Sequence, residues 1–320
     1  MVHLAAKNNI TVISKNYRSK LYALLPGVFH LHSFVKSFQP DIIHSHLYSG
    51  ELLVCLYKML FRNPITCVSS VQSLRRQLRK RNILTKNIVD ALVRKYYRKI
   101  IACSEAVKHE LITNGYGQHM IEVIYNGIDF SKFIPPKREP VLPEKPVIGF
   151  IGRLATYKGT DIFIKAIPPV IKEYPSSIFW IIGDGTEKEH LIRMVQDLGI
   201  INHVQFWGFQ TNTAQFLSQF SLLAVPSLTE PLGIVALEGL AMSLPVIASN
   251  IEGLKEIIQH DETGYLVEPG SSNELAKRII EVLHNYPSAC KVAAKGNAYC
   301  KMHFNIQSLS EKQLKLYQSL

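Results

Sequence analysis

The fold class of this chain is decided by residues 146–182, PVIGFIGRLATYKGTDIFIKAIPPVIKEYPSSIFWII. This stretch begins and ends with a short apolar run, which is the pattern of a buried strand. Between the two runs, residues 160–173 predict an amphipathic helix that starts at Thr160 or Asp161 as its cap. A strand, a helix and a second strand in this order are typical of a βαβ unit, in which the two strands pair in parallel.

The same alternation of apolar runs and amphipathic segments continues in both directions. Downstream, strands are predicted at 203–208, 221–227 and 245–249, and helices at 188–198, 213–219, 233–242, 254–259 and 273–283. Upstream, strands are predicted at 10–14, 41–46, 65–70, 99–104 and 122–127, with helices between them. Residues 134–146 hold five prolines and mixed charge, the composition of an interdomain linker. The predicted fold class is therefore α/β, with two doubly wound domains.

Composition excludes several other classes of protein. The chain has 320 residues, of which 47% are apolar and 19% charged, so it is neither a disordered chain nor a coiled coil. The longest apolar stretch, residues 233–249, contains Glu238 and Pro245 and does not predict a spanning helix. Residues 1–15 lack the pattern of a secretion signal. The five cysteines show no C-x-x-C spacing, so we expect reduced thiols in a cytoplasmic protein.

The formal net charge of +11 is concentrated in one part of the chain. Residues 58–108 contain 13 Lys or Arg and two acidic residues, and residues 75–99 interleave basic with apolar and aromatic side chains. Such a surface attracts anionic lipid headgroups, at roughly 1 kcal/mol per basic residue near the membrane. A nucleic acid would meet the same charges, and a solvated helix face without a partner is the third interpretation.

Two carboxylates mark residues 226–249, PSLTEPLGIVALEGLAMSLPVIAS. Glu238 is the only charged residue between Pro231 and Ile251, and it falls on a predicted apolar helix. Carboxylates are rarely buried without a partner. Glu238 therefore meets either a ligand with hydroxyl or amide donors, or a backbone or basic group of the protein core. Glu230 lies just before the same helix.

The start of that helix is a candidate anion site. The backbone N–H groups of Leu232, Gly233 and Ile234 form its exposed end, where the helix dipole favours negative charge. The segment GRLATYKG (152–159) adds Arg153 and Lys158 at the carboxyl end of a strand, where open α/β sheets bind ligands. Together these groups predict a cradle for a diphosphate. Taken alone, the two cations would be ordinary exposed loop charges.

Several motifs in one order resemble the retaining glycosyltransferases of family 4, which have two Rossmann-like domains facing a cleft, the GT-B architecture. The matching residues are IGRLATYKG (151–159), IIGDGTEKEHL (181–191), FWGF (206–209), Glu230 to Glu238, GLKEII (253–258), TGYLVEPG (263–270), ACSEAVKHEL (102–111) and VIYNGIDFSKF (123–133). The resemblance runs from about residue 8 to the C-terminus.

This resemblance implies a role for each candidate residue of the second half. The diphosphate of a nucleotide-sugar would be held by Arg153, Lys158, Leu232, Gly233 and Ile234. The nucleoside would be bound by Glu238, at the ribose hydroxyls, and by Phe209, Gln210 and Thr211, which would line the base largely through their backbone. Glu230 would face the donor sugar as a catalytic residue.

Two histidines are the candidates in the first half. His44 and His46 alternate along DIIHSH (41–46), so both point to one face at the carboxyl end of a strand. His46 resembles the family histidine that faces the donor sugar from the acceptor domain, which makes it the second catalytic candidate. H-x-H spacing also suits a metal hydrolase. No further His cluster and no D-x-D pair accompanies it, so we expect no metal and no other cofactor.

The resemblance also implies a strand and a glycine-rich loop ahead of residues 10–14. Because Met1 falls near the end of the helix that would follow them, we expect the first domain to lack its initial strand. The predicted domains are residues 1–140, which bind the acceptor, residues 141–304, which bind the nucleotide-sugar, and residues 305–320, an amphipathic helix that returns to the first domain.

The sequence therefore predicts a retaining glycosyltransferase that moves a sugar from a nucleoside diphosphate donor to a glycolipid or polysaccharide acceptor in cell-envelope glycan synthesis. The expected partners are the donor, a lipid-linked or saccharide acceptor and an anionic membrane surface that contacts residues 75–99; nucleic acid is not expected. The expected place is the cytoplasm, at the inner face of the cytoplasmic membrane. The alternative is a truncated form or a nucleotide-sugar-binding subunit that binds the donor without transferring the sugar.

Overall fold

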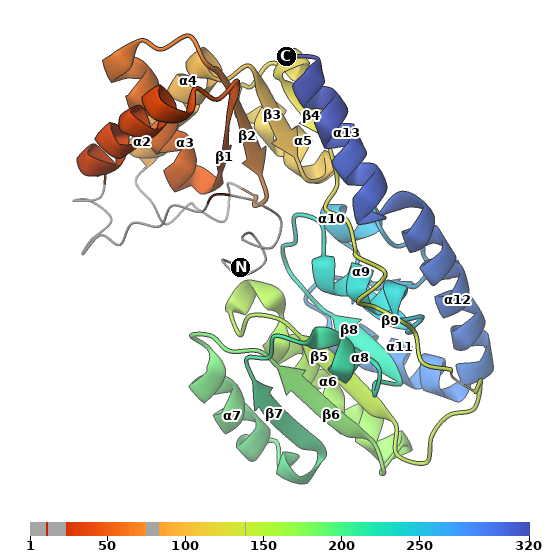
Figure 1. Cartoon of the computed structure of the whole chain (residues 1–320). Coiled ribbons are helices and arrows are strands. Elements are labelled where there is room, and N and C mark those ends of the chain that lie inside the picture. Colours follow the sequence, from red (N-terminus) through yellow and green to blue (C-terminus); the bar gives the residue numbers. More distant parts are fainter. Residues whose placement is uncertain (1–10, 12–23, 75–82, 138) are drawn as a thin grey trace. The chain divides into compact units, whose positions relative to one another are not determined.

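The computed structural model of the chain describes residues 11, 24–74, 83–137 and 139–320 (Figure 1). Two compact units make up the chain: residues 1–70 with 81–99, and residues 71–80 with 100–320. The predicted strand at 10–14 and the densest basic segment, 75–81, fall outside the described residues, as does the predicted incomplete start of the first domain. The domain boundaries at residues 140 and 304 stay a prediction.

The first sheet has four strands in the order β1-β2-β3-β4. Its strands are β1 (Ile42–His46), β2 (Thr66–Val71), β3 (Lys99–Ala102) and β4 (Ile121–Val123). Its helices are α2 (Leu24–Phe38), α3 (Leu47–Phe61), α4 (Ile83–Tyr96) and α5 (Glu105–Thr113), with a 3-10 turn, η2 (Gln118–Met120), before β4. β1 pairs with β2 in parallel, and so does β3 with β4. The four strands predicted between residues 41 and 127 are confirmed.

The second sheet has six strands, and every neighbouring pair is parallel. They are β5 (Val147–Ile151), β6 (Ile178–Ile182), β7 (Val204–Gly208), β8 (Leu222–Val225), β9 (Val246–Ser249) and β10 (Tyr265–Val267). Their order is β10-β9-β8-β5-β6-β7, so the sheet starts at its centre and winds outward twice. This is the 3-2-1-4-5-6 order of the Rossmann fold, and the predicted doubly wound α/β fold class is confirmed.

Apolar side chains cover both faces of this sheet. Along β8, Leu222 and Ala224 belong to one buried cluster, whereas Leu223 and Val225 belong to the other. Successive side chains of a strand point to opposite faces, so an uninterrupted apolar strand needs a layer of helices on each side. The helices are α6 (Thr160–Glu173), α7 (Lys188–Asp197), α8 (Thr213–Leu217), α9 (Ile234–Ala241), α10 (Glu252–Lys255) and α11 (Ser272–His284), with 3-10 turns η3 (Thr156–Lys158) and η4 (Ile201–His203).

Three elements differ from the sequence-based predictions. The helix predicted at 254–259 is α10, which occupies 252–255, and the strand β10 was not predicted. The helix α12 (Tyr286–His303) was also missed, because Pro287 and Gly296 weaken a helical pattern that has no clear apolar stripe. Pro287 is tolerated because it lies in the first turn, where its missing N–H needs no partner.

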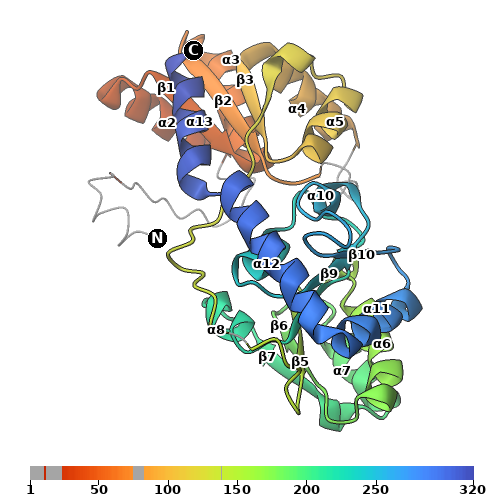
Figure 2. The same cartoon turned by 90° about the vertical axis from the view of Figure 1, so that its right-hand side faces the viewer.

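The last two helices follow one another along the chain (Figure 2). α12 packs on α9, and α13 (Ile306–Gln318) confirms the amphipathic helix predicted at 305–320, with Leu309 and Leu316 buried. Its return to the first domain stays a prediction. Across the described residues, every helix is too short or too polar to span a membrane. All five cysteines lie in the described part of the chain, and no disulfide joins any two of them there.

Candidate functional site

Backbone hydrogen bonds join three loops at the carboxyl edge of the second sheet. The Leu154 N–H donates to the Asp184 carbonyl over 3.0 Å, which ties the loop after β5 to the loop after β6. The Leu228 N–H donates to the Tyr157 carbonyl over 2.8 Å, which ties the loop after β5 to the loop after β8. Open α/β sheets bind ligands at this edge. The segment with Arg153 and Lys158 is therefore held against the segment with Glu230.

The central contact at this edge is an ion pair between Lys158 and Glu230. The Lys158 Nζ lies 2.5 Å from Glu230 Oε2, and the Ser227 hydroxyl donates to the same oxygen over 3.3 Å. Glu230 is only 8% exposed, so Lys158 supplies the charge that a buried carboxylate requires. Among the described residues, none pairs with Glu230 Oε1. One oxygen of Glu230 is thus held by the protein and the other is available to a ligand.

Next to this pair, α9 begins at a residue that cannot cap it. Gly233 precedes the first helical residue with φ of 101°, in the left-handed region that favours glycine. A Cβ there would lie 2.5 Å from Leu254 Cδ2, so a side chain would also require Leu254 to shift. Because Gly233 supplies no capping group, the N–H groups of Leu232, Gly233 and Ile234 keep the anion-binding character that the sequence predicts.

Arg153 is the second cation that the sequence assigns to this edge. It follows β5 in the loop that carries Lys158, and its side chain is exposed. In the described part of the chain it makes no ion pair, so its charge is available to a ligand. Its role at a diphosphate stays a prediction.

Glu238 lies on α9, one turn after Ile234, the first residue of the helix. Its environment differs from that of Glu230. Its Oε2 atom is buried and has no hydrogen-bond partner among the described residues. Burial raises the pKa of Glu238 to about 7, and a hydrogen bond with the Thr213 side chain opposes part of this rise. Of the two sequence-based interpretations, a core carboxylate bonded to the backbone or to a basic residue finds no support in these contacts, since the partner that they show is the Thr213 side chain.

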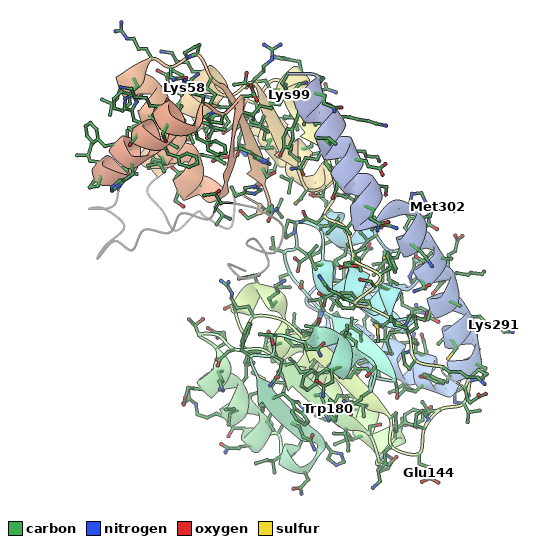
Figure 3. All side chains as sticks on the ribbon, viewed as in Figure 1. Lys58, Lys99, Glu144, Trp180, Lys291 and Met302 are labelled. Carbon is green, nitrogen blue, oxygen red and sulfur yellow. The ribbon has the colours of Figure 1, made fainter. Side chains whose placement is uncertain are left out.

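Residues 209–211, which the family resemblance assigns to the base of the nucleotide, follow β7. Phe209 is 73% exposed and Thr211 is exposed, whereas the Gln210 side-chain amide donates to the Trp207 carbonyl over 2.9 Å. Trp207 packs on Trp180, with ring centroids 4.8 Å apart; Figure 3 labels Trp180 on the second sheet. Residues 209–211 begin two positions after Trp207, and Thr213, two positions after them, hydrogen-bonds Glu238. Contact between residues 209–211 and a base stays a prediction.

The two histidines of β1 lie together, as the alternation predicted. Their ring centroids are 4.3 Å apart, and His44 Nε2 lies 2.8 Å from the Ser70 hydroxyl. Burial, and then the charge of His46, lower the pKa of His44 to about 4, so His44 is neutral at pH 7. His46 is exposed, and Leu47 directly after it has φ of 66°, a strained value that is typical of functional positions. The catalytic role of His46 stays a prediction.

No group of three or more His, Cys, Asp or Glu residues suited to a metal ion occurs in the part of the chain that the structure describes. The absence of a metal from the reaction stays a prediction. Sequence reasoning missed Ser227 and Thr213, which contact the two candidate carboxylates. Their only sequence signal is their position, at the end of β8 and at the start of α8, where loops approach the ligand-binding edge.

Two parallel sheets with alternating helices, one of them in Rossmann order, make up an α/β fold, and it matches solved structures of GT-B glycosyltransferases. The chain belongs to the glycosyl transferases group 1 family, whose model matches residues 133–298. Residues 5–132 match the model of Glycosyltransferase Family 4, so the family suggested by the motifs is confirmed.

Curated relatives are similar at low identity. The lipopolysaccharide core biosynthesis glycosyltransferase LpsE of Rhizobium meliloti is 28% identical over 176 residues, which cover 55% of this chain and 51% of that protein. The glycogen synthase of Mycobacterium tuberculosis is 25% identical over 289 residues, or 88% of this chain and 69% of that protein. The chain spans about half the length of the relatives LpsE and MJ1607 of Methanocaldococcus jannaschii.

Among solved structures, Anabaena Alr3699/HepE in complex with UDP-glucose matches with a TM-score of 0.88 and 22% identity, over all of this chain and 89% of that chain. Sucrose-phosphate synthase from Thermosynechococcus elongatus matches with a TM-score of 0.82 and 21% identity, over 97% of this chain and 81% of that chain. At this identity the likeness establishes the fold alone.

The raised pKa of Glu238 predicts a pH dependence of stability. Between its ordinary value of 4.5 and about 7, the folded protein binds a proton that the unfolded chain has lost, so the free energy of unfolding falls as pH rises through this window. Glu238→Gln removes this term. In urea unfolding, we expect the stability of the variant relative to the wild type to increase by about 3 kcal/mol between pH 5 and pH 8.

Glu262→Gln, at an exposed position, serves as the control and should show no such change. Parallel pH profiles for the wild type and Glu238→Gln would contradict the assignment of a buried carboxyl with a raised pKa at residue 238.

Proposed function

We propose that this protein is a retaining glycosyltransferase that moves a hexose or N-acetylhexosamine from a nucleoside diphosphate donor to a glycolipid or polysaccharide acceptor of the cell envelope. The observation that carries the proposal is the Lys158–Glu230 pair beside the uncapped start of α9. Together these groups suit an activated sugar. The cation and the backbone N–H groups suit its diphosphate, and the available carboxylate oxygen suits a sugar hydroxyl.

Departure of the diphosphate is the step that these groups serve. Negative charge develops on the leaving group as the bond to the sugar breaks, and fixed cations and N–H groups stabilise that charge. Lys158, Arg153 and the N–H groups at residues 232–234 provide both kinds of donor. In this proposal they supply the positive charge that a divalent cation supplies elsewhere, so the reaction needs no metal and no other cofactor.

Recognition of the donor is divided between the two carboxylates. Glu230 Oε1 accepts a hydrogen bond from a hydroxyl of the donor sugar, while Oε2 keeps its hydrogen bonds from Lys158 and Ser227. Glu238 accepts hydrogen bonds from the ribose hydroxyls, which would give its Oε2 atom a partner. Residues 209–211 line the base of the nucleotide. His46 is the second catalytic residue of this proposal and acts on the donor sugar.

The proposed acceptor follows from relatives and from the surface. LpsE is named for lipopolysaccharide core biosynthesis, and a relative from Staphylococcus aureus is a poly(ribitol-phosphate) alpha-N-acetylglucosaminyltransferase. In the described part of residues 75–99, Lys95 on α4 and Arg98 in the turn after α4 are exposed, and Ile88 on α4 is 53% exposed. Basic and apolar groups on this helix and the turn after it support peripheral binding to an anionic membrane at its cytoplasmic face.

Donor turnover by the purified protein tests this function. With UDP-glucose, UDP-N-acetylglucosamine and GDP-mannose as a panel, we expect at least one donor to be consumed, with retention at the anomeric carbon and undiminished rate in EDTA. Arg153→Ala should lower kcat/KM about 100-fold, as loss of one electrostatic stabiliser of a leaving group does. Arg193→Ala, at an exposed position on α7, is the matched control and should leave the rate unchanged.

Binding measurements separate this function from its alternative. A nucleotide-sugar-binding subunit would bind a donor of the panel and lose that binding in Glu238→Ala, yet consume none. If no donor binds and Glu238→Ala changes nothing, both functions are wrong.

Membrane binding is tested with vesicles. We expect the protein to sediment with vesicles containing phosphatidylglycerol and to remain free with neutral phosphatidylcholine vesicles. Because each basic residue near the surface contributes about 1 kcal/mol, the double charge reversal Lys95→Glu and Arg98→Glu should weaken binding at least tenfold. Lys291→Glu with Lys295→Glu, on the exposed side of α12, makes the same change in net charge elsewhere. Equal losses in the two double variants would mean that net charge alone drives the binding.

A further inference from the structure

The short helix α10 and the turn after it connect two parts of the second compact unit. On one side lies the start of α5, and on the other lies the loop from Glu230 to Gly233, which forms the candidate donor site. All of these residues belong to the same unit of the chain. The contacts on the two sides differ in kind, since one is electrostatic and the other is steric.

The electrostatic contact is made by Glu256. Its Oε2 accepts the N–H of Glu105 over 2.7 Å, and its Oε1 accepts the N–H of Ala106 over 2.8 Å. Hydrogen bonds from a carboxylate to the first N–H groups of a helix are charge-assisted and are strengthened by the helix dipole. Tyr125, which follows β4, hydrogen-bonds the same carboxylate. Glu256 is therefore fixed by three groups that lie far from it in sequence.

A local cap for α5 is present without Glu256. The Ser104 hydroxyl accepts the N–H of Val107 over 3.1 Å, and Glu105 places a carboxylate in the first turn. These are the groups that an ordinary helix uses at its start. The additional bidentate contact from 150 residues away therefore does more for α10 than for α5, because it fixes the position of α10.

The steric contact lies on the opposite side of α10. A Cβ on Gly253 would lie 2.3 Å from the carbonyl oxygen of Glu230, so the helix backbone rests directly on the backbone of the loop. Leu254 occupies the space where a Cβ of Gly233 would stand, at 2.5 Å. Any displacement of α10 must then move the residues that carry Glu230 and the N–H groups at the start of α9.

We infer that Glu256 is a positioning residue of the donor site: it anchors α10 to the start of α5 and so fixes the backbone of residues 230–234. It touches neither Lys158 nor the carboxylate of Glu230, and it acts on the donor through Gly253 and Leu254. The inference rests on the proposed function, because it assumes that residues 230–234 bind a nucleoside diphosphate.

Glu256→Gln tests the inference, because it keeps the size of the side chain but loses the charge and one of the two acceptors. We expect the Kd for UDP and the KM for the donor to rise about tenfold, because the loss of a charged hydrogen bond from Glu256 weakens the anchor that fixes residues 230–234. Glu256→Ala should give a larger change. Glu252→Gln, at an exposed position on the same helix, is the matched control and should behave as the wild type.

A purely structural role would give a different result. If Glu256 only stabilised the fold, the variants would lose melting temperature and active fraction, while the Kd and KM of the folded protein stayed unchanged; that outcome overturns the inference. Should Glu256→Ala fail to fold, Glu256→Gln decides. If the wild type binds UDP and Glu256→Gln binds it equally well, only this inference is wrong. If the wild type binds neither UDP nor any nucleotide-sugar of the panel, the proposed function is wrong as well.

Discussion

The contact between Lys158 and Glu230 is the interaction on which the rest of the site depends. A carboxylate at the edge of an apolar sheet loses most of its hydration, and its desolvation must be offset by a nearby charge and by hydrogen bonds. Lys158 supplies the charge and Ser227 the hydrogen bond. The fold makes this possible because the Lys158 loop and the Glu230 loop follow β5 and β8, which are neighbours at the centre of the sheet. The parallel order of the strands therefore determines which charges meet.

The two carboxylates of this region show how environment separates two chemically identical groups. Glu230 and Glu238 lie eight positions apart on the chain, yet Glu230 has a cation within 2.5 Å and Glu238 has a buried oxygen without a partner. The first is held by an ion pair with Lys158, whereas burial shifts the pKa of the second to about 7. A ligand with hydroxyl groups would be a donor to the second carboxylate and would favour its ionised form. The proposed division of roles between sugar and ribose comes from the family resemblance, and the different environments of the two carboxylates are compatible with it.

Sequence reasoning was most successful where a single period controls the structure. Residues 160–173 form a helix with the predicted bounds, and the first five strands of the second sheet, β5 to β9, appear within two residues of their predicted positions, because buried strands and amphipathic helices have distinct periods. The prediction failed at β10, which has three residues, and at α12, whose pattern contains Pro287 and Gly296. It also could not place Thr213 beside Glu238 or Glu256 beside Glu105, because both contacts depend on how distant segments pack. Position at the carboxyl edge predicted Arg153 and Lys158 as site residues, but it did not predict the ion pair between Lys158 and Glu230.

Charge balance at the edge of the sheet links the ion pair to the proposed chemistry. Without a ligand, the charges of Lys158 and Glu230 compensate each other, and Arg153 remains exposed without an ion pair in the described part of the chain. A bound diphosphate would add negative charge beside a carboxylate, an arrangement that is unfavourable unless cations and N–H groups outweigh it. Lys158 must then interact with the carboxylate of Glu230 and with the diphosphate at the same time. This requirement explains why the proposed site combines a shared cation, a second cation and an uncapped helix start, since none of the three alone would balance both the carboxylate and the leaving group.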